Sequence, residues 1–302
     1  LSNPDFSSVQ KVSIREIGED NNSAMGASIL VDGAPVSNNA NLQSYSTSRP
    51  DNNFSTTIGL GIDLRQISTD NIESVEVVKG IPSVIFGDLT SGAVVIKTKA
   101  GYTPWELKLK TDAQIKQFTL GKGFKLKSKQ SNINFNFDYL QSVDDLRSKY
   151  KGFNRITAEV GFSKIFNLQK SPLTYHAKLN LFGTVDDVKT DPDAMVAGEK
   201  IESEEKGLRF NMFGKWSPKM KLLTNLDYSF SVSYAHQVSR GERFRSMSGI
   251  QVISTAYTEG ENAGLFLPSE QFTTYSVDGK PVNVFLQITG NKFINLHRGA
   301  SN

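Results

Sequence analysis

Long segments of alternating apolar and polar residues constrain this chain most. In "NINFNFDY", Ile133, Phe135, Phe137 and Tyr139 alternate with asparagine and aspartate. A period of two puts the apolar side chains on one face of a β-strand and the polar side chains on the other. The pattern therefore predicts consecutive antiparallel strands of one sheet. About seven such strands are expected, near 104–113, 115–127, 131–142, 152–165, 174–186, 207–216 and 222–235.

A soluble sandwich and a membrane barrel both satisfy this alternation. Segments of about 9–11 residues or more match a barrel span better than the usual strand of a soluble protein. Aromatic residues near the strand ends resemble the interfacial girdle of a membrane barrel. Short links also alternate with long polar ones, although the first link, "DAQ", is short and breaks this rule. Outer-membrane barrels have this asymmetry, with short periplasmic turns and long outer loops. The aromatic residues are Trp105, Tyr139, Trp216 and Tyr234.

Composition narrows the classes of function. The chain has 302 residues, a net charge of +3 and no cysteine, which excludes disulfides and thiolate chemistry. The basic residues are spread along the chain, so no nucleic-acid partner is expected. No apolar run approaches the roughly 18 residues of a membrane helix. We find no nucleophile–base arrangement and no metal-ligand spacing among the three histidines, so we expect no enzyme, no metal site and no cofactor.

The segment before Gly101 has a different character, with short apolar runs between glycines. The dipeptide Asp32-Gly33 after "ASILV" is a turn signal. The spacing from Gly87 to Gly92 matches a phosphate-binding loop, but Ala93 and Val94 follow where lysine and a hydroxyl residue are required. We therefore reject a phosphate site and predict a small mixed α/β domain with tight turns.

Three segments carry a family resemblance: "VSIREIG" (12–18), "ILVDGAPV" (29–36) and "IESVEVVKGIPSVIFGDLTSGAVVIKTKAG" (72–101). They resemble the plug domain of TonB-dependent outer-membrane receptors of the Bacteroidetes type. The chain departs from the usual pattern at Glu16, Ile81 and Phe86, and "GDLTSGAVVI" differs from the corresponding segment of the SusC-like glycan importers. The positions that match the family are Arg15, Asp32, Gly33, Glu73, Glu76, Gly80, Pro82, Gly87, Gly92 and Val94.

The resemblance implies an α/β plug domain at residues 1–101, followed at 102–302 by the first ~7 strands of a transmembrane β-barrel. Plugged transporters close with about 22 strands, and single-chain bacterial barrels use even numbers. We therefore expect a fragment of a longer receptor. The part from His236 onward is expected to be an outer loop with a hairpin turn at Asp278-Gly279.

The resemblance also implies active transport across the bacterial outer membrane. The substrate would be a scarce nutrient: an iron chelate, haem, cobalamin, a glycan or a peptide. The implied partners are TonB with its inner-membrane energising complex, the outer-membrane lipid and, as a further candidate, a surface lipoprotein. Arg15, Glu73 and Glu76 would form releasable ion pairs with the barrel wall. The alternatives are a non-energised pore or adhesin and a soluble glycan-binding β-protein.

Overall fold

The computed structural model describes most of the chain after residue 26. None of the described residues belongs to a helix that is long and apolar enough to cross a membrane. The described ranges are 27–36, 64–79, 92–126, 130–143, 146–147, 150–168, 171–189, 200–218, 220, 223–246, 251–254, 264–267 and 270–292.

A small N-terminal sheet has the strand order β2-β1-β4-β3. Strands β1 and β4 are parallel, and the other two pairs are antiparallel. Asp32 and Gly33 form the two-residue turn between β1 and β2 with φ of 52° and 83°, which confirms the predicted turn. The core of this unit consists of Ile29, Val31, Val36, Val94 and Ile96. The elements are β1 (Ala27–Val31), β2 (Ala34–Pro35), the 3-10 helices η3 (Leu64–Gln66) and η4 (Thr69–Asn71), β3 (Ile72–Lys79) and β4 (Gly92–Thr98).

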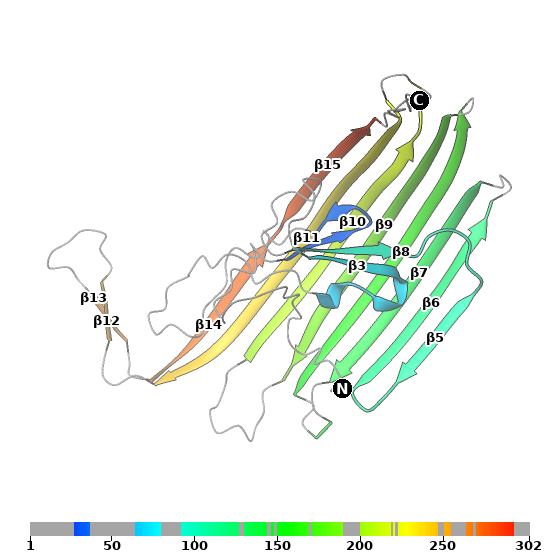
Figure 1. Ribbon diagram of the computed structural model, residues 1–302. Coiled ribbons are helices and arrows are strands. Elements are labelled where there is room, and N and C mark those ends of the chain that lie inside the picture. The colour runs from blue at the N-terminus through cyan, green and yellow to red at the C-terminus, as the bar shows by residue number, and fades with distance from the viewer. Residues whose placement is uncertain are drawn as a thin grey trace, which may run out of the picture.

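A second, much larger sheet forms a curved wall (Figure 1). Each of its strands is antiparallel to its neighbours, as expected when successive strands are joined by hairpins. A separate two-stranded hairpin follows β11. The strands are β5 (Glu106–Thr111), β6 (Ile115–Lys125), β7 (Ser131–Val143), β8 (Lys151–Leu168), β9 (Ser171–Val188), β10 (Lys200–Trp216), β11 (Asn225–Ser246), β12 (Gln251–Ser254), β13 (Gly264–Leu267), β14 (Glu270–Gly279) and β15 (Val282–Asn291).

Residues 270–291 and the part of β11 after His236 belong to the wall rather than to a loop, so that part of the sequence prediction is wrong. Strand β11 continues to Ser246, and both β14 and β15 pair with it. Gln237 faces Gly279 and Tyr234 faces Val282, so the register is the same on both sides of Lys280-Pro281. Asp278-Gly279 is therefore not a hairpin turn. Proline only interrupts the ladder because it has no N–H, and its carbonyl still accepts the N–H of Ala235 at 3.1 Å.

The two faces of the wall have opposite polarity. The concave face buries polar side chains, as β8 illustrates with Arg155, Thr157 and Glu159. On the opposite face of the same strand, Ile156 and Val160 are 50% and 54% exposed. A soluble sandwich would bury its apolar face, whereas a membrane barrel turns that face toward lipid. The wall therefore has the polarity of a membrane barrel.

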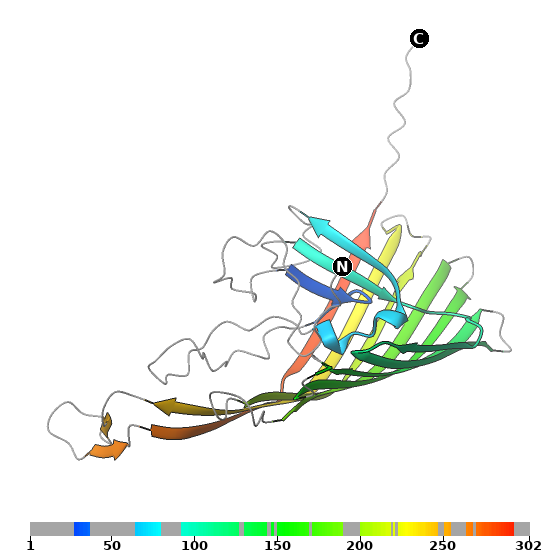
Figure 2. The same cartoon turned by 90° about the horizontal axis from the view of Figure 1, so that it is seen from below.

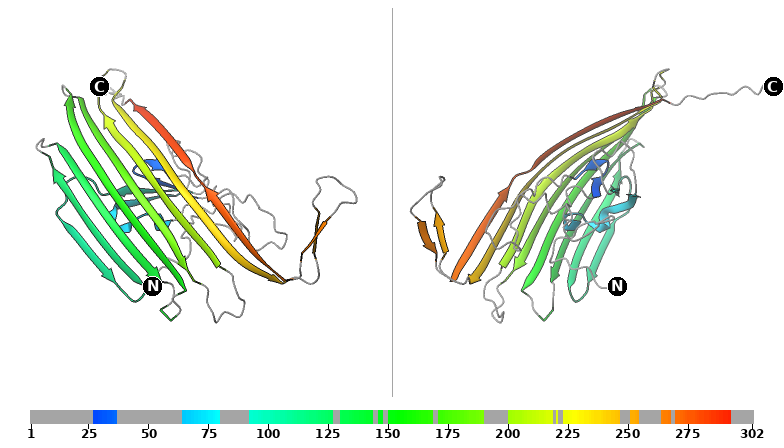
Figure 3. Two further views of the ribbon diagram at one scale, coloured as in Figure 1. Left: turned by 180° about the vertical axis from the view of Figure 1, so that it is seen from behind. Right: turned by 60° about the vertical axis from the view of Figure 1, so that its left-hand side comes forward.

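The links between strands differ in length at the two ends of the wall. At one end, links 126–130, 169–170 and 217–224 are short. At the other end, link 189–199 is longer, and β11 and β14 project beyond their neighbours toward β12 and β13 (Figure 3). The predicted alternation is met only in part, because link 144–150, expected to be long, is shorter than link 217–224, expected to be short.

Candidate functional site: the contact between sheet and wall

The N-terminal sheet and the two 3-10 helices lie on the concave side of the wall (Figure 2). This is the face on which the wall presents its buried polar and charged side chains. Buried charges are costly unless they are paired and hydrogen-bonded. The partners of these charges therefore show how the two units are joined.

The first contact is centred on Asp32, in the turn between β1 and β2. Its carboxylate accepts hydrogen bonds from the N–H and the hydroxyl of Thr98 on β4, at 2.9 and 2.7 Å. The Nζ of Lys178, on β9 of the wall, lies 3.1 Å from Oδ2 of Asp32. Lys178 also donates to the carbonyl oxygen of Thr98 at 3.0 Å and to its hydroxyl oxygen. One wall lysine thus holds two strands of the small sheet.

Other polar side chains of the wall extend this first contact. Glu159 on β8 accepts a long hydrogen bond of 3.4 Å from the Thr98 hydroxyl. Asn211 and Ser229 donate to the carbonyl oxygens of Val31 and Gly33, each at 3.4 Å. The turn at Asp32 is therefore surrounded by donors from three wall strands, β9, β10 and β11.

The second contact is centred on Arg155 of β8, which is 3% exposed. Its Nη2 and Nε atoms donate to Oδ1 of Asp138 on β7, at 2.6 and 3.2 Å. Its Nη1 donates to the carbonyl oxygens of Arg65 and Ile67 at 3.0 and 3.2 Å. The guanidinium therefore links the wall to the backbone of η3 and of the residue that follows it. Its planar set of donors suits this double role better than an ammonium would.

Arg65 reinforces the second contact from the side of the small unit. Its Nη1 lies 3.0 Å from Oδ1 of Asp186 on β9. Its guanidinium carbon lies 4.3 Å from the ring centroid of Phe153, which is completely buried. A desolvated cation–π contact of this kind adds to the ion pair.

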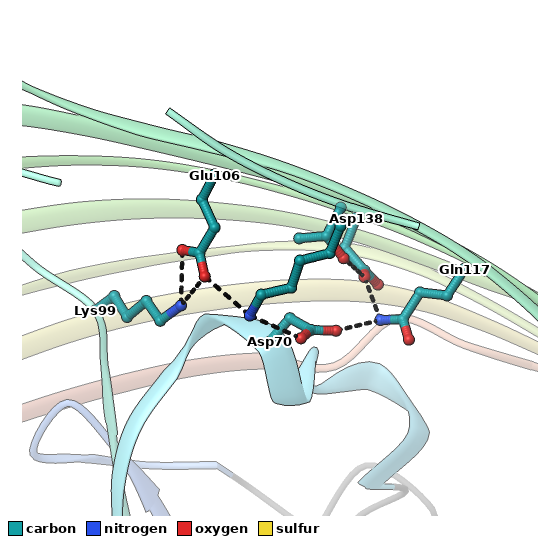
Figure 4. A network of polar contacts seen from close by, with 7 residues as sticks. Asp70, Lys99, Glu106, Gln117 and Asp138 are labelled. Carbon is teal, nitrogen blue, oxygen red and sulfur yellow. Dashed lines mark hydrogen bonds and ion pairs between the residues drawn. The ribbon is translucent and has the colours of Figure 1, made fainter. Parts of the chain in front are cut away.

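A third set of contacts lies at the β5 edge of the wall (Figure 4). Nζ of Lys108 lies 2.9 Å from a Glu106 oxygen and 3.2 Å from Oδ1 of Asp70 in η4. The amide of Gln117 donates to both Asp70 and Asp138, at 2.7 and 2.6 Å. Lys108 and Asp70 are partly exposed, so this set contributes less stability than the two buried contacts.

The structure places the predicted signature residues in different environments. Asp32 is at the centre of the first contact, Gly33 completes the turn, and Gly92 begins β4 with φ of 141°. Glu73 and Glu76 are exposed, and none of the ion pairs among the described residues includes either one. The expected pairing of these two glutamates with the wall therefore finds no partner among the described residues and stays a prediction. Arg15, Gly80, Pro82 and Gly87 lie outside the described residues.

Apart from Asp32, the main contact residues were not predicted from the sequence. Arg65 and Asp70 lie in a segment that carries no motif. Arg155 and Lys178 occupy polar positions of alternating strands, so the period of two indicates their face but not their partners. A charged residue within the polar face of a predicted membrane strand is a usable signal, because such a charge must find a partner.

A cavity of about 620 Å³ lies between β4 and wall strands β9 to β11, next to the first contact. Asp32 and Lys178 form part of its lining. His176 also lines it, stacked on Phe213 with ring centroids 5.0 Å apart. The seam between sheet and wall is therefore not completely filled.

Comparisons with known proteins agree with this architecture. Residues 2–94 match the family described as the TonB-dependent Receptor Plug Domain. The N-terminal unit therefore matches the plug domain of TonB-dependent receptors, and a large antiparallel sheet follows it in the chain. No curated protein sequence matches the chain.

Solved structures of two receptors resemble the chain at low identity. One is the ferric enterobactin receptor PfeA from Pseudomonas aeruginosa, with 16% identity and a TM-score of 0.42, covering 86% of this chain and 38% of that receptor. The other is the siderophore receptor PirA from Acinetobacter baumannii, with 13% identity and a TM-score of 0.45. The match covers 87% of this chain and 38% of that receptor. The chain thus spans 38% of the length of each.

Proposed function

We propose that this chain provides the plug and adjoining wall of an energised transporter in the bacterial outer membrane. A nutrient binds at the end with the long loops, TonB and its inner-membrane complex pull on the plug, and the seam between plug and wall opens. The substrate class is an iron chelate, haem, cobalamin, a glycan or a peptide.

The observation that carries the proposal is the nature of the plug–wall contact. The plug is held by a few charged side chains at separate points, chiefly Lys178 at Asp32 and Arg155 at the carbonyls of Arg65 and Ile67. Such contacts are stable when dry, but water can replace them once the seam opens. The unfilled cavity beside Lys178 gives the seam a place to begin opening.

A reversible cross-link between plug and wall tests this proposal. The chain has no cysteine, so a disulfide can form only between the two cysteines that are introduced. A Cβ added at Gly33 would lie 3.6 Å from Oγ of Ser229, so Gly33→Cys with Ser229→Cys joins the plug to β11, although a cysteine at φ of 83° adds some backbone strain. Uptake is measured in cells with a panel of ferric chelates, haem, cobalamin, an oligosaccharide and peptides, with and without an uncoupler. We expect energy-dependent uptake of one probe, lost on oxidation and restored by reduction.

The matched control joins two wall strands only. Lys206 and His236 are cross-strand neighbours of β10 and β11, so Lys206→Cys with His236→Cys leaves the plug free. Uptake should continue in this oxidised control. Uptake that is insensitive to the uncoupler would instead favour the non-energised pore. Energised uptake that survives the plug–wall cross-link would exclude movement of the plug at this seam.

A further inference from the structure

Three stretches of sequence around short links of the wall contain no acidic residues. The sequence contains no aspartate or glutamate in 113–137, 160–185 or 206–226. Each of these stretches runs across one of the short links between wall strands. Near this end, the described basic residues on the outer face of the wall include Lys122 and Lys164.

At this end, two lysines stand on the lipid-facing side among aromatic rings. Nζ of Lys122 on β6 lies 4.6 Å from the ring centroid of Trp105 and 5.1 Å from that of Phe124. Nζ of Lys164 on β8 lies 4.4 Å from the ring centroid of Phe166. Neither lysine has an ion pair with a carboxylate among the described residues.

The aromatic residues around Lys122 form a connected group. Trp105 meets Phe124 and Phe135 edge to face, with centroids 6.5 and 6.0 Å apart. Trp105 is 61% exposed on this face. Aromatic rings of this kind sit at the level of the lipid headgroups, where lysine stems lie along apolar surface and the ammonium reaches the interface.

We propose that Lys122 and Lys164, with the ring of Trp105, bind the headgroups of anionic phospholipids in the leaflet next to the short links. The partner follows from charge complementarity, since Lys122 and Lys164 stand on the lipid-facing side and neither has an ion pair with a carboxylate among the described residues. The lipid-facing side at the other end differs, because there Lys206 pairs with Glu204 and His236 with Asp278. The inference deepens the proposed function and rests on it only in requiring that the wall spans a membrane.

Lipid retention tests the assignment. The complete native receptor is reconstituted into vesicles of phosphatidylcholine with a minority of phosphatidylglycerol, extracted into detergent, and its bound lipids are measured by mass spectrometry. We expect phosphatidylglycerol to be enriched over its share in the vesicle. A lysine near a membrane surface contributes about a five-fold preference for anionic lipid. Lys122→Gln with Lys164→Gln should therefore lower the enrichment by about five-fold or more.

Two variants control the experiment. Lys122→Arg with Lys164→Arg keeps the charge and should keep the enrichment. Lys206→Gln removes an exposed lysine at the opposite end and should leave the enrichment unchanged. Enrichment that is absent in the wild type, retained in the double glutamine variant, or lost equally in Lys206→Gln overturns the inference.

Vesicle flotation separates this result from the proposed function. Receptor that floats with the vesicles but shows no lipid preference refutes the lipid site and leaves transport untouched. Receptor that does not enter the vesicles refutes both. A failure of the plug–wall cross-link to block uptake bears only on transport.

Discussion

The ammonium of Lys178 on the wall lies 3.1 Å from the carboxylate of Asp32 in the plug, and both side chains are 4% exposed. The two residues are far apart in the chain and belong to different sheets. Because Asp32 also accepts two hydrogen bonds from Thr98, the pair joins the β1–β2 turn, β4 and β9 at a single point.

Lys178→Met should loosen the plug strongly. The variant leaves the carboxylate of Asp32 buried without its cation, which typically costs about 3–5 kcal/mol. We expect faster hydrogen exchange at the amides of 92–98 and faster proteolysis of the plug. Lys189→Met serves as the control, because Lys189 is 64% exposed and lies 3.9 Å from Asp187. Equal exchange in the two variants would show that the Lys178 pair does not hold the plug.

Arg155→Lys should loosen a different part of the plug. A lysine keeps the charge near Asp138 but cannot reach that carboxylate and the carbonyls of Arg65 and Ile67 together. We expect increased hydrogen exchange at 64–71 and little change at 92–98. Uniform loosening of the whole plug would contradict two separate contacts.

A charged residue introduced on the outer face of the wall should destabilise the protein more the closer it lies to the middle of the membrane. Val160→Lys places an ammonium on the apolar part of β8, where the cost in a membrane is about 2–4 kcal/mol. Asn154→Lys lies on the same face of the same strand, nearer to the long-loop end, where the cost is about 0–1 kcal/mol. The folded fraction in vesicles at increasing urea measures both. Similar urea midpoints would mean that this face does not contact lipid.

Gly214→Ala should destabilise the wall by overpacking. A Cβ at Gly214 would overlap the carbonyl oxygen of Thr174 and the hydroxyl of Tyr228. That hydroxyl donates to the Thr174 carbonyl at 2.9 Å, across the space that glycine leaves open. We expect a loss of about 1–3 kcal/mol in the free energy of unfolding.

Gly183→Ala is the matched control for this variant, since the nearest atom to its added Cβ would be 3.9 Å away. Both variants can be followed by the urea midpoint of the folded protein. A midpoint for Gly214→Ala that equals that of Gly183→Ala would show that the strands can move apart at no cost.

Local sequence determined which residues form strands and which face each side chain takes. In β7, the alternation of phenylalanine with asparagine already separates a lipid face from an inner face, because a strand repeats every two residues. Asp32-Gly33 likewise determines its turn, since both positions require positive φ. By contrast, Asp278-Gly279 carries the same local signal and lies at the end of β14, in register with β15, because pairing with the long β11 outweighs the turn preference.

Only the tertiary structure decided which charges meet. Glu73 and Glu76 stand in the motif and have no ion-pair partner among the described residues, whereas Lys178 and Arg155 stand in no motif and hold the plug. The period of a strand specifies a face, but the partner across the seam depends on how a separate sheet docks. That docking is set by the need of each buried charge to find a counter-charge or a carbonyl, which is a property of two distant segments together.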